Sequence, residues 1–175
     1  PVRPGLVLTA LLLSAAGYSL LQSLVVPALP TLTAELGAST TGAAWIFTVF
    51  LLTTCVATPI VGRLGDMLGR RRLLLAMLVA VIVGSFVAAV ADSLAVMIAG
   101  RAVQGLGGAV FPLAFGIIRE VLPRERVSTS IALVSGVLGI GGVLGIVLAG
   151  PILDHLSYHW LFWIPLAAIV PVAVA

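Results

Sequence analysis

Charged side chains are scarce in this chain of 175 residues, and many of them lie in one short run. Residues 62–72 read Gly-Arg-Leu-Gly-Asp-Met-Leu-Gly-Arg-Arg-Arg, a basic, glycine-punctuated turn between two long apolar stretches. A carboxylate among arginines can form ion pairs or lie against the positive end of a helix. Contacts of this kind can join two helix ends and release them again. The run is therefore a candidate gate, and its assigned residues are Gly62, Asp66, Gly69, Arg70 and Arg71.

A second charged group lies inside an apolar segment rather than in a loop. Arg101 is followed at helical spacing by Gln104, Gly105 and Gly108, which share its helix face. A charge within a membrane costs about 2.5–3.5 kcal/mol on insertion scales, so it requires polar partners or water. We expect Arg101 to face an internal cavity. The alternative is an arginine that extends to the outer membrane interface.

A polar stripe runs along the first apolar segment. Ser14, Tyr18 and Gln22 recur at every fourth residue, which places them on one face of a helix. We assign these side chains to substrate binding. The alternative is that they form hydrogen bonds between helices without touching a substrate.

Small residues follow a regular spacing near the end of the chain. Gly141, Gly145 and Ala149 form a stripe that lets two helix backbones approach closely, and Gly150 is assigned to the same packing function. His155 and His159 have the spacing of a metal pair on a helix, but no further ligand converges on them, so no metal site is assigned.

The lack of lysine excludes two kinds of chemistry. All nine basic residues are arginine, so the chain has no P-loop lysine and no lysine for a Schiff base. ATP-driven transport by this chain and pyridoxal phosphate chemistry are thereby excluded. We expect no cofactor and no enzymatic activity.

Composition identifies the solvent in which the chain folds. It is 61% hydrophobic and 9% charged, whereas a soluble domain carries roughly 25% charged residues. Such a chain cannot cover itself with polar surface in water, so we expect it to lie in a bilayer. Its net charge of only +3 is confined mainly to short loops, which favours membrane topology over nucleic-acid binding.

The elements that must position these residues are membrane-spanning helices. About 20 apolar residues cross the hydrocarbon core. The sequence predicts an all-α membrane protein whose six transmembrane helices cover residues 6–29, 43–61, 73–91, 94–118, 128–152 and 160–175. Eight of the nine arginines lie in alternate connections or at the N-terminal end, which predicts that these segments are cytoplasmic.

Two motifs resemble those of the major facilitator superfamily of secondary transporters. Residues 62–72 are similar to its loop pattern Gly-x-x-x-Asp-x-x-Gly-Arg-Arg/Lys-Arg/Lys, and residues 101–109 resemble the fourth-helix pattern Arg-x-x-Gln-Gly-x-Gly-Ala-Ala of proton-coupled members. The resemblance implies that Arg101, with Gln104, Gly105 and Gly108, acts in proton coupling. It also implies that six helices form the N-terminal half of a transporter, built as two inverted three-helix repeats. The substrate site then lies between this half and a C-terminal six-helix half.

Two further segments resemble drug:proton antiporters of the fourteen-helix type. Residues 20–30 are similar to their first-helix motif, with Leu21 in the position of an aspartate, and residues 141–150 resemble an antiporter motif in which Ile146 replaces a proline. Every acidic residue falls in a loop or at the end of a span. We therefore expect that any proton coupling does not depend on a carboxylate within these spans.

The resulting functional hypothesis is proton-coupled efflux of amphiphilic small molecules or drugs. The expected partners are the C-terminal half, the lipid bilayer, a small-molecule substrate and protons, with no nucleic acid. The expected location is a bacterial inner membrane, with the N-terminus in the cytoplasm. Two alternatives remain: an uptake carrier for a nutrient such as a sugar or organic acid, and a non-transporting membrane sensor or assembly module.

Overall fold

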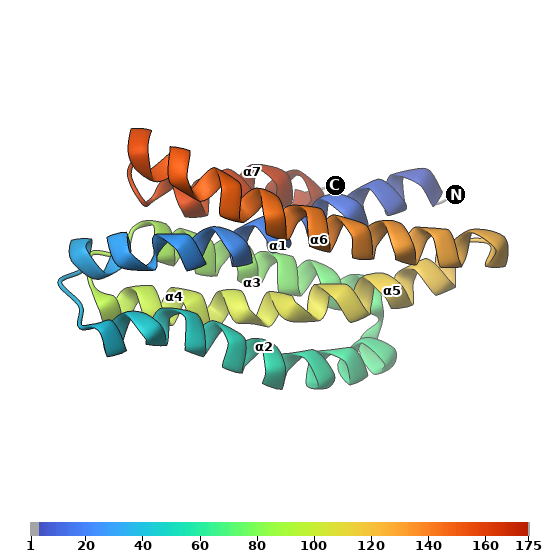
Figure 1. Cartoon of the computed structure of the whole chain (residues 1–175). Coiled ribbons are helices and arrows are strands. Elements are labelled where there is room, and N and C mark those ends of the chain that lie inside the picture. The colour runs from blue at the N-terminus through green and yellow to red at the C-terminus, as the bar shows by residue number, and fades with distance from the viewer. Residues whose placement is uncertain (1–3, 175) are drawn as a thin grey trace.

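The protein is a bundle of long helices, described by a computed structural model over residues 4–174 (Figure 1). No strand occurs in this part of the chain. The elements are α1 (Pro4–Glu35), α2 (Thr40–Leu68), α3 (Arg70–Ala89), α4 (Leu94–Gly105), the 3₁₀ helix η1 (Leu106–Ala109), α5 (Val110–Val121), α6 (Arg124–His155) and α7 (Trp160–Val174).

The helices have the length and composition of membrane spans. Five helical segments are long and apolar enough to cross a bilayer, with α4, η1 and α5 together forming one of them, and α7 is a shorter apolar helix. The prediction of an all-α membrane protein is therefore confirmed. Most helices extend beyond the predicted spans; α1, for example, continues through Pro30 to Glu35.

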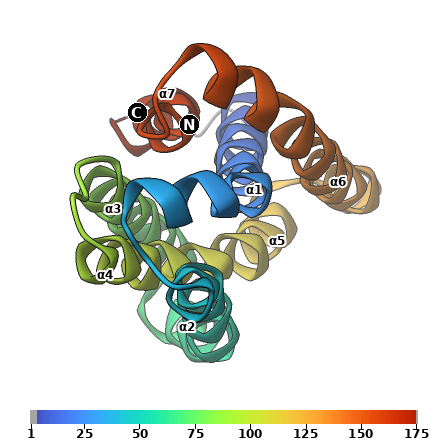
Figure 2. The ribbon, with the colours of Figure 1, turned by 60° about the vertical axis from the view of Figure 1, so that its left-hand side comes forward.

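The first helix lies inside the bundle. It packs along α6 and α7 and also contacts α2 and α5, while α3 and α2 both pack against α4 (Figure 2). Side chains from α1, including Tyr18 and Leu21, are buried in one apolar cluster with residues of α2, α3 and α5. A second cluster around Leu24, Ile46 and Phe162 fills the bundle nearer the α1–α2 connection.

The Arg-rich run differs from its predicted form. We expected a turn over residues 62–72, but α2 continues to Leu68, α3 begins at Arg70, and only Gly69 is non-helical. Gly69 has φ of +97°, a conformation that side chains disfavour, so a single glycine reverses the chain between two helices. The run is thus two helix ends that meet, which brings Asp66 and Arg70 into reach of each other.

The fourth span is interrupted where the sequence predicts a continuous helix. Residues 106–109 form a 3₁₀ turn between α4 and α5. Gly107 and Gly108 lie in this segment and Gly105 directly precedes it; glycine is a weak helix former, so the α-helical geometry yields locally to packing against neighbouring helices.

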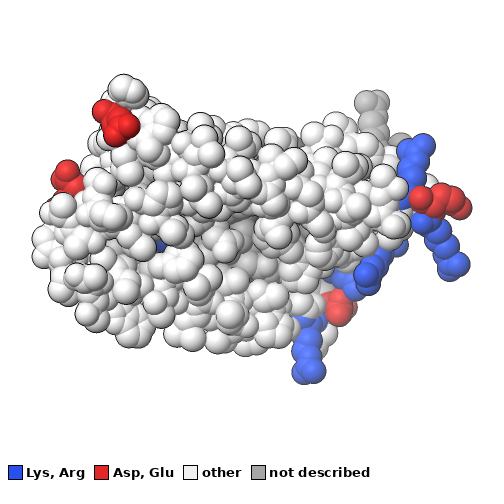
Figure 3. Space-filling view, in the orientation of Figure 1, with Lys and Arg blue, Asp and Glu red and all other residues white. Residues whose placement is uncertain are grey.

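Charge separates along the bundle. Arginine side chains gather at the end that carries the α2–α3 and α5–α6 connections, whereas carboxylates are visible at both ends (Figures 1 and 3). Among residues 4–174 the exposed arginines are Arg63, Arg71, Arg72, Arg119, Arg124 and Arg126.

The contact between α3 and α4 yields a stability prediction. A Cβ added at Gly100 would lie 2.8 Å from the backbone nitrogen of Ala88, and one at Gly84 would lie 2.7 Å from that of Gln104. Backbone cannot move aside as a flexible side chain can. Gly100→Ala should therefore cost about 1–3 kcal/mol and lower the midpoint of thermal unfolding in detergent.

Gly62→Ala is the matched control for this measurement. Gly62 lies in helix α2, and an added Cβ would meet no atom within 4 Å. Because alanine is the better helix former, this variant should be at least as stable as the parent protein. An equal loss of stability in both variants would contradict close backbone packing of α3 on α4.

Candidate functional site

A buried charge is the centre of the candidate site. Arg101 donates from Nη1 to Oε1 of Gln104 at 2.8 Å and from Nε to the carbonyl oxygen of Ile46 at 3.4 Å. Its guanidinium carbon lies 4.1 Å from the ring centroid of Phe50, a cation–π contact. Gln104 in turn donates from Nε2 to Oγ of Ser85 at 2.8 Å. We call these five residues the Arg101 cluster; they come from α2, α3 and α4.

The expectation that Arg101 faces the central cavity stays a prediction. In residues 4–174 its side chain is buried, with 0% of it exposed. The physical reason is the pair of glycines that we had assigned to the cavity. An added Cβ at Gly105 would lie 2.6 Å from the Phe50 carbonyl oxygen, and Gly108 packs equally closely on Thr54, so α2 closes over Arg101.

One hydrogen-bond donor of the Arg101 cluster has no partner. Nη2 of Arg101 is the one buried side-chain nitrogen or oxygen in residues 4–174 that has no hydrogen-bond partner. A charged guanidinium that is buried among neutral groups raises the free energy of the folded state, because it has lost its hydration and has no countercharge. The arrangement can therefore accept one more hydrogen-bond acceptor, such as a water molecule or a group on a ligand.

A hydrogen-bonded chain lies next to this cluster. Thr54 donates from Oγ1 to the carbonyl oxygen of Gly105 at 3.0 Å, and the Tyr18 hydroxyl lies 3.3 Å from the same Oγ1. Because the single proton of Thr54 is already donated, Tyr18 must donate its own proton to Thr54. The Tyr18 ring also stacks on Phe50 and meets the edge of Phe111, with centroid separations of 5.9 and 5.8 Å.

The three residues of the predicted polar stripe have different surroundings. Ser14 is buried and donates to the carbonyl oxygen of Ala10 in its own helix, at 2.8 Å. Tyr18 is buried in the aromatic group, and Gln22 is half-buried. Ser14 therefore has a local backbone partner, and ligand contact by Ser14, Tyr18 and Gln22 stays a prediction.

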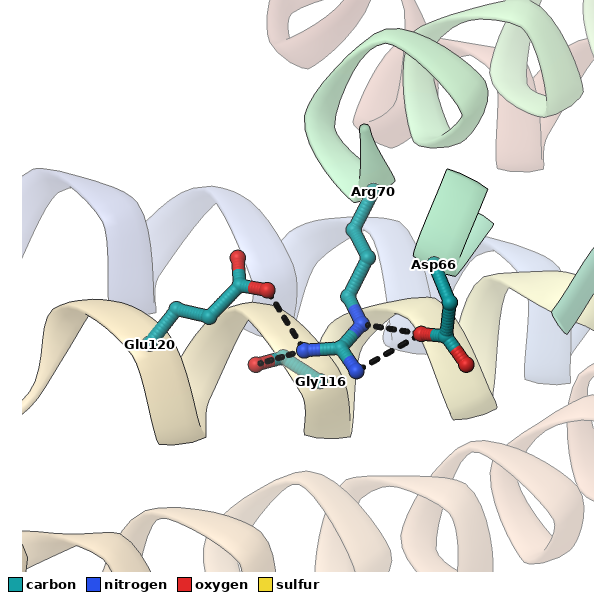
Figure 4. Close-up of polar contacts among 4 residues, drawn as sticks. All are labelled: Asp66, Arg70, Gly116 and Glu120. Carbon is teal, nitrogen blue, oxygen red and sulfur yellow. Dashed lines mark hydrogen bonds and ion pairs between the residues drawn. The ribbon is translucent and has the colours of Figure 1, made fainter. Parts of the chain in front are cut away.

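Arg70 is the centre of a network at the arginine-rich end (Figure 4). Its Nε and Nη2 donate to Oδ1 of Asp66 at 3.0 and 2.7 Å, and its Nη1 donates to Oε1 of Glu120 at 2.6 Å. Nη1 also donates to the carbonyl oxygen of Gly116 at 3.2 Å. These four residues, the Arg70 network, join the ends of α2 and α3 to α5. Sequence reasoning missed Gly116 and Glu120, because their distance of about 50 residues from Arg70 gives no local signal.

The other residues assigned to the gate lie outside this network. Gly69 forms the turn itself, and Gly62 is a helical residue at which an added Cβ would meet nothing within 4 Å. Arg71 is exposed, and the ion pairs within residues 4–174 both involve Arg70 rather than Arg71.

Helix α6 packs on α1 through part of its small-residue stripe. An added Cβ at Gly141 would lie 2.8 Å from Ser19, and one at Gly145 would lie 2.6 Å from Ser23, both on α1. Ala149 is also buried. Gly150 is exposed and does not share this contact, because five residues after Gly145 it lies about 140° around the helix.

The acidic side chains lie in the connections or near the ends of the helices. Each acidic side chain is exposed, and Leu21, in the position of the aspartate in the antiporter motif, is fully buried. In the α6–α7 connection, Tyr158 donates to the carbonyl oxygen of Ala91 at 2.9 Å and stacks on His159. Burial, together with the nearby carboxylates of Asp92 and Glu35, raises the pKa of the Tyr158 hydroxyl.

The chain is similar in sequence to several transporters. The chain is 38% identical over its full length to an uncharacterised MFS-type transporter of Mycobacterium tuberculosis, of which it covers 25%. It is 34% identical over 90% of its length to multidrug resistance protein 3 of Bacillus subtilis, covering 31% of that protein. It is 32% identical over 94% of its length to the multidrug export protein EmrB of Haemophilus influenzae, covering 33%. The chain thus spans a quarter to a third of these relatives.

The fold is also found in a solved transporter. The human organic anion transporter MFSD10 superposes with a TM-score of 0.79 at 20% sequence identity, over 99% of this chain and 47% of the transporter. The family model of the Major Facilitator Superfamily matches residues 11–175. The chain belongs to the Major Facilitator Superfamily.

Proposed function

We propose that this chain is the N-terminal half of a secondary active transporter that exports amphiphilic small molecules in exchange for protons. The observation that carries the proposal is the fully buried charge of Arg101 inside a membrane bundle. Ionisable groups at such positions are costly and mark substrate or ion pathways. Two relatives are named as multidrug proteins, which favours export. The proposed activity is transport, which needs no cofactor and no chemical conversion of the substrate.

The distribution of arginine supports an orientation. The arginine-rich end of the bundle is cytoplasmic by the positive-inside rule, which places the N-terminus of this half on the same side. The location we propose is a bacterial inner membrane, like that of a drug exporter. The Arg70 network then lies at the cytoplasmic end of the transport pathway.

Two apolar surfaces support a second half as partner. Helix α2 carries an apolar groove of about 420 Å³ that includes Leu52, Val56 and Ile60, and α6 carries one of about 430 Å³ around Gly136 and Ile140. Both helices lie at the outside of the bundle (Figure 2). Because the chain covers only a quarter to a third of its relatives, we propose that helices of a C-terminal half pack into both grooves.

The buried polar groups suggest how transport proceeds. In the state described, α2 covers Arg101 and the Tyr18–Thr54 chain. A movement of α2 relative to α4 would open the Arg101 cluster to the space between the halves. The unpartnered Nη2 would then donate a hydrogen bond to water or to an acceptor on the substrate. This contact would change the electrostatic field around the guanidinium, and with it the affinity of the site for protons and substrate.

Transport assays on the complete protein test this function. The protein in proteoliposomes should expel an amphiphilic dye when a proton gradient is imposed, and dissipation of the gradient should stop the export. Counterflow without export would support an uptake carrier instead. Binding of the dye with no movement across the membrane would support a non-transporting module.

The Arg70 network predicts the effect of removing one charge. Asp66→Asn weakens the contact with Arg70 and removes the charge that we propose lies against the partner half. Contacts of a carboxylate with a helix end contribute about 0.3–1 kcal/mol, so the balance of states should shift toward inward-facing by up to about fivefold. We expect slower export, measured as initial rates in proteoliposomes, with an unchanged yield of folded protein.

Glu125→Gln is the matched control for the gate. Glu125 is an exposed acid in the first turn of α6, and the ion pairs within residues 4–174 do not include it. This variant should transport at the parental rate. Normal export and normal cytoplasmic accessibility in Asp66→Asn would show that Asp66 has no part in a gate.

Proton-coupled export should require an arginine side chain at position 101. Arg101→Ala should abolish proton-coupled export while membrane insertion is retained or improved, because an internal charge is removed. Arg101→Lys should restore little activity, since an ammonium cannot reproduce the two hydrogen bonds and the flat contact with Phe50. Full coupled activity in either variant would exclude this role for Arg101.

The positions of the acids give a prediction about coupling. Because every acidic side chain in this half is exposed, neutralising Glu35, Asp92 or Asp154 singly should leave export dependent on the pH gradient. The measurement is the transport rate in vesicles as a function of the imposed gradient. If one of these variants folds normally but no longer responds to the gradient, a carboxylate of this half carries the proton.

A further inference from the structure

Gly116 lies where the Arg70 guanidinium rests on α5. A Cβ added at Gly116 would overlap Cδ and Nε of Arg70 and would lie 2.8 Å from its Cζ. The carbonyl oxygen of the same glycine accepts a hydrogen bond from Nη1. The guanidinium therefore occupies the space that any other residue at 116 would fill with its side chain (Figure 4).

A second glycine borders the stem of the same arginine. An added Cβ at Gly65, on α2, would lie 3.5 Å from Cγ of Arg70 and 2.5 Å from Cδ2 of Leu113 on α5. Both glycines are buried. The arginine thus passes between two helices that approach each other through glycine and ends against the backbone of α5.

The acidic partners alone do not explain this placement. The side chains of Asp66 and Glu120 are 61% and 57% exposed, whereas that of Arg70 is 27% exposed. Exposed ion pairs couple weakly, because water and salt screen them and long side chains lose freedom. The bare backbone at 116 supplies a surface that restricts the guanidinium to the point where both carboxylates reach it.

We propose that Gly116 is a positioning residue for the cytoplasmic gate: it holds the Arg70 guanidinium on α5 and so makes the α2–α3 turn move together with the fourth span. The inference rests on the gate role proposed for the Arg70 network. That residue 116 acts through Arg70 can also be tested by protein stability, without a transport assay.

The atoms that an alanine would meet make the test selective. Gly116→Ala meets the far end of a flexible side chain, which can swing away, so the helices themselves need not move. Alanine also favours the helix. The variant should therefore fold and insert normally while the guanidinium is displaced from Asp66 and Glu120.

The experiment is a double-mutant cycle with Arg70→Ala in the complete transporter, read by thermal unfolding and by the initial transport rate. In the parent background, Gly116→Ala should lower the unfolding midpoint and slow transport about two- to fivefold, the range for loss of an exposed ion pair. In the Arg70→Ala background the same substitution should leave transport unchanged and raise the midpoint, because only the gain in helix propensity remains.

Gly5→Ala is a control in helix α1, where an added Cβ meets nothing within 4 Å; it should leave transport unchanged and should not lower the midpoint. An equal loss in both backgrounds, or no loss in either, would overturn the positioning role. A midpoint that depends on Arg70 as expected, together with parental transport in Gly116→Ala and Asp66→Asn, would retain the positioning of Arg70 and reject its use as a gate.

Discussion

The structure is organised around a charge that has no countercharge. Arg101 is enclosed by α2, α3 and α4, and its described partners are an amide, a backbone carbonyl and an aromatic face. In a medium without water, such a group forces its neighbours into fixed positions, because any loss of a hydrogen bond leaves a donor exposed to hydrocarbon. The register of α2 against α4 follows from this requirement: Ile46 must present its carbonyl and Phe50 its ring at one level.

Glycine makes this enclosure possible. Gly105 and Gly108 let α2 approach the fourth span, and the η1 turn adapts that span to the approach. Glycine also allows close approach at other contacts of the bundle: Gly141 and Gly145 pack against α1, and Gly116 lies against Arg70. In a membrane, where apolar surface gains little by leaving lipid, close backbone packing and hydrogen bonds supply much of the association between helices. The positions of glycine therefore determine which helices meet and where polar groups are shut in.

Features that depend on local chemistry could be predicted from the sequence. Hydropathy identified the helices, arginine placement identified the two ends of the bundle, and the spacing of Gly141 and Gly145 identified a packing face. Contacts with distant segments could not be predicted. Gly105 and Gly108 indicate close packing beside Arg101, but the sequence does not show that Ile46 and Phe50 of α2 are the residues that enclose it. Glu120 and Thr54 were missed for the same reason, since their partners Arg70 and Tyr18 lie on other helices.

The most direct test of this account is a double-mutant cycle between Arg101 and Gln104, measured as unfolding midpoints in detergent. Gln104→Leu should lower the midpoint strongly, because the guanidinium remains buried without its shortest hydrogen bond. Adding Arg101→Met to that variant should recover most of the loss, because replacing both polar partners by apolar groups leaves nothing unpaired between them. If the two losses simply add, the guanidinium and the amide do not form one buried unit, and the account is contradicted.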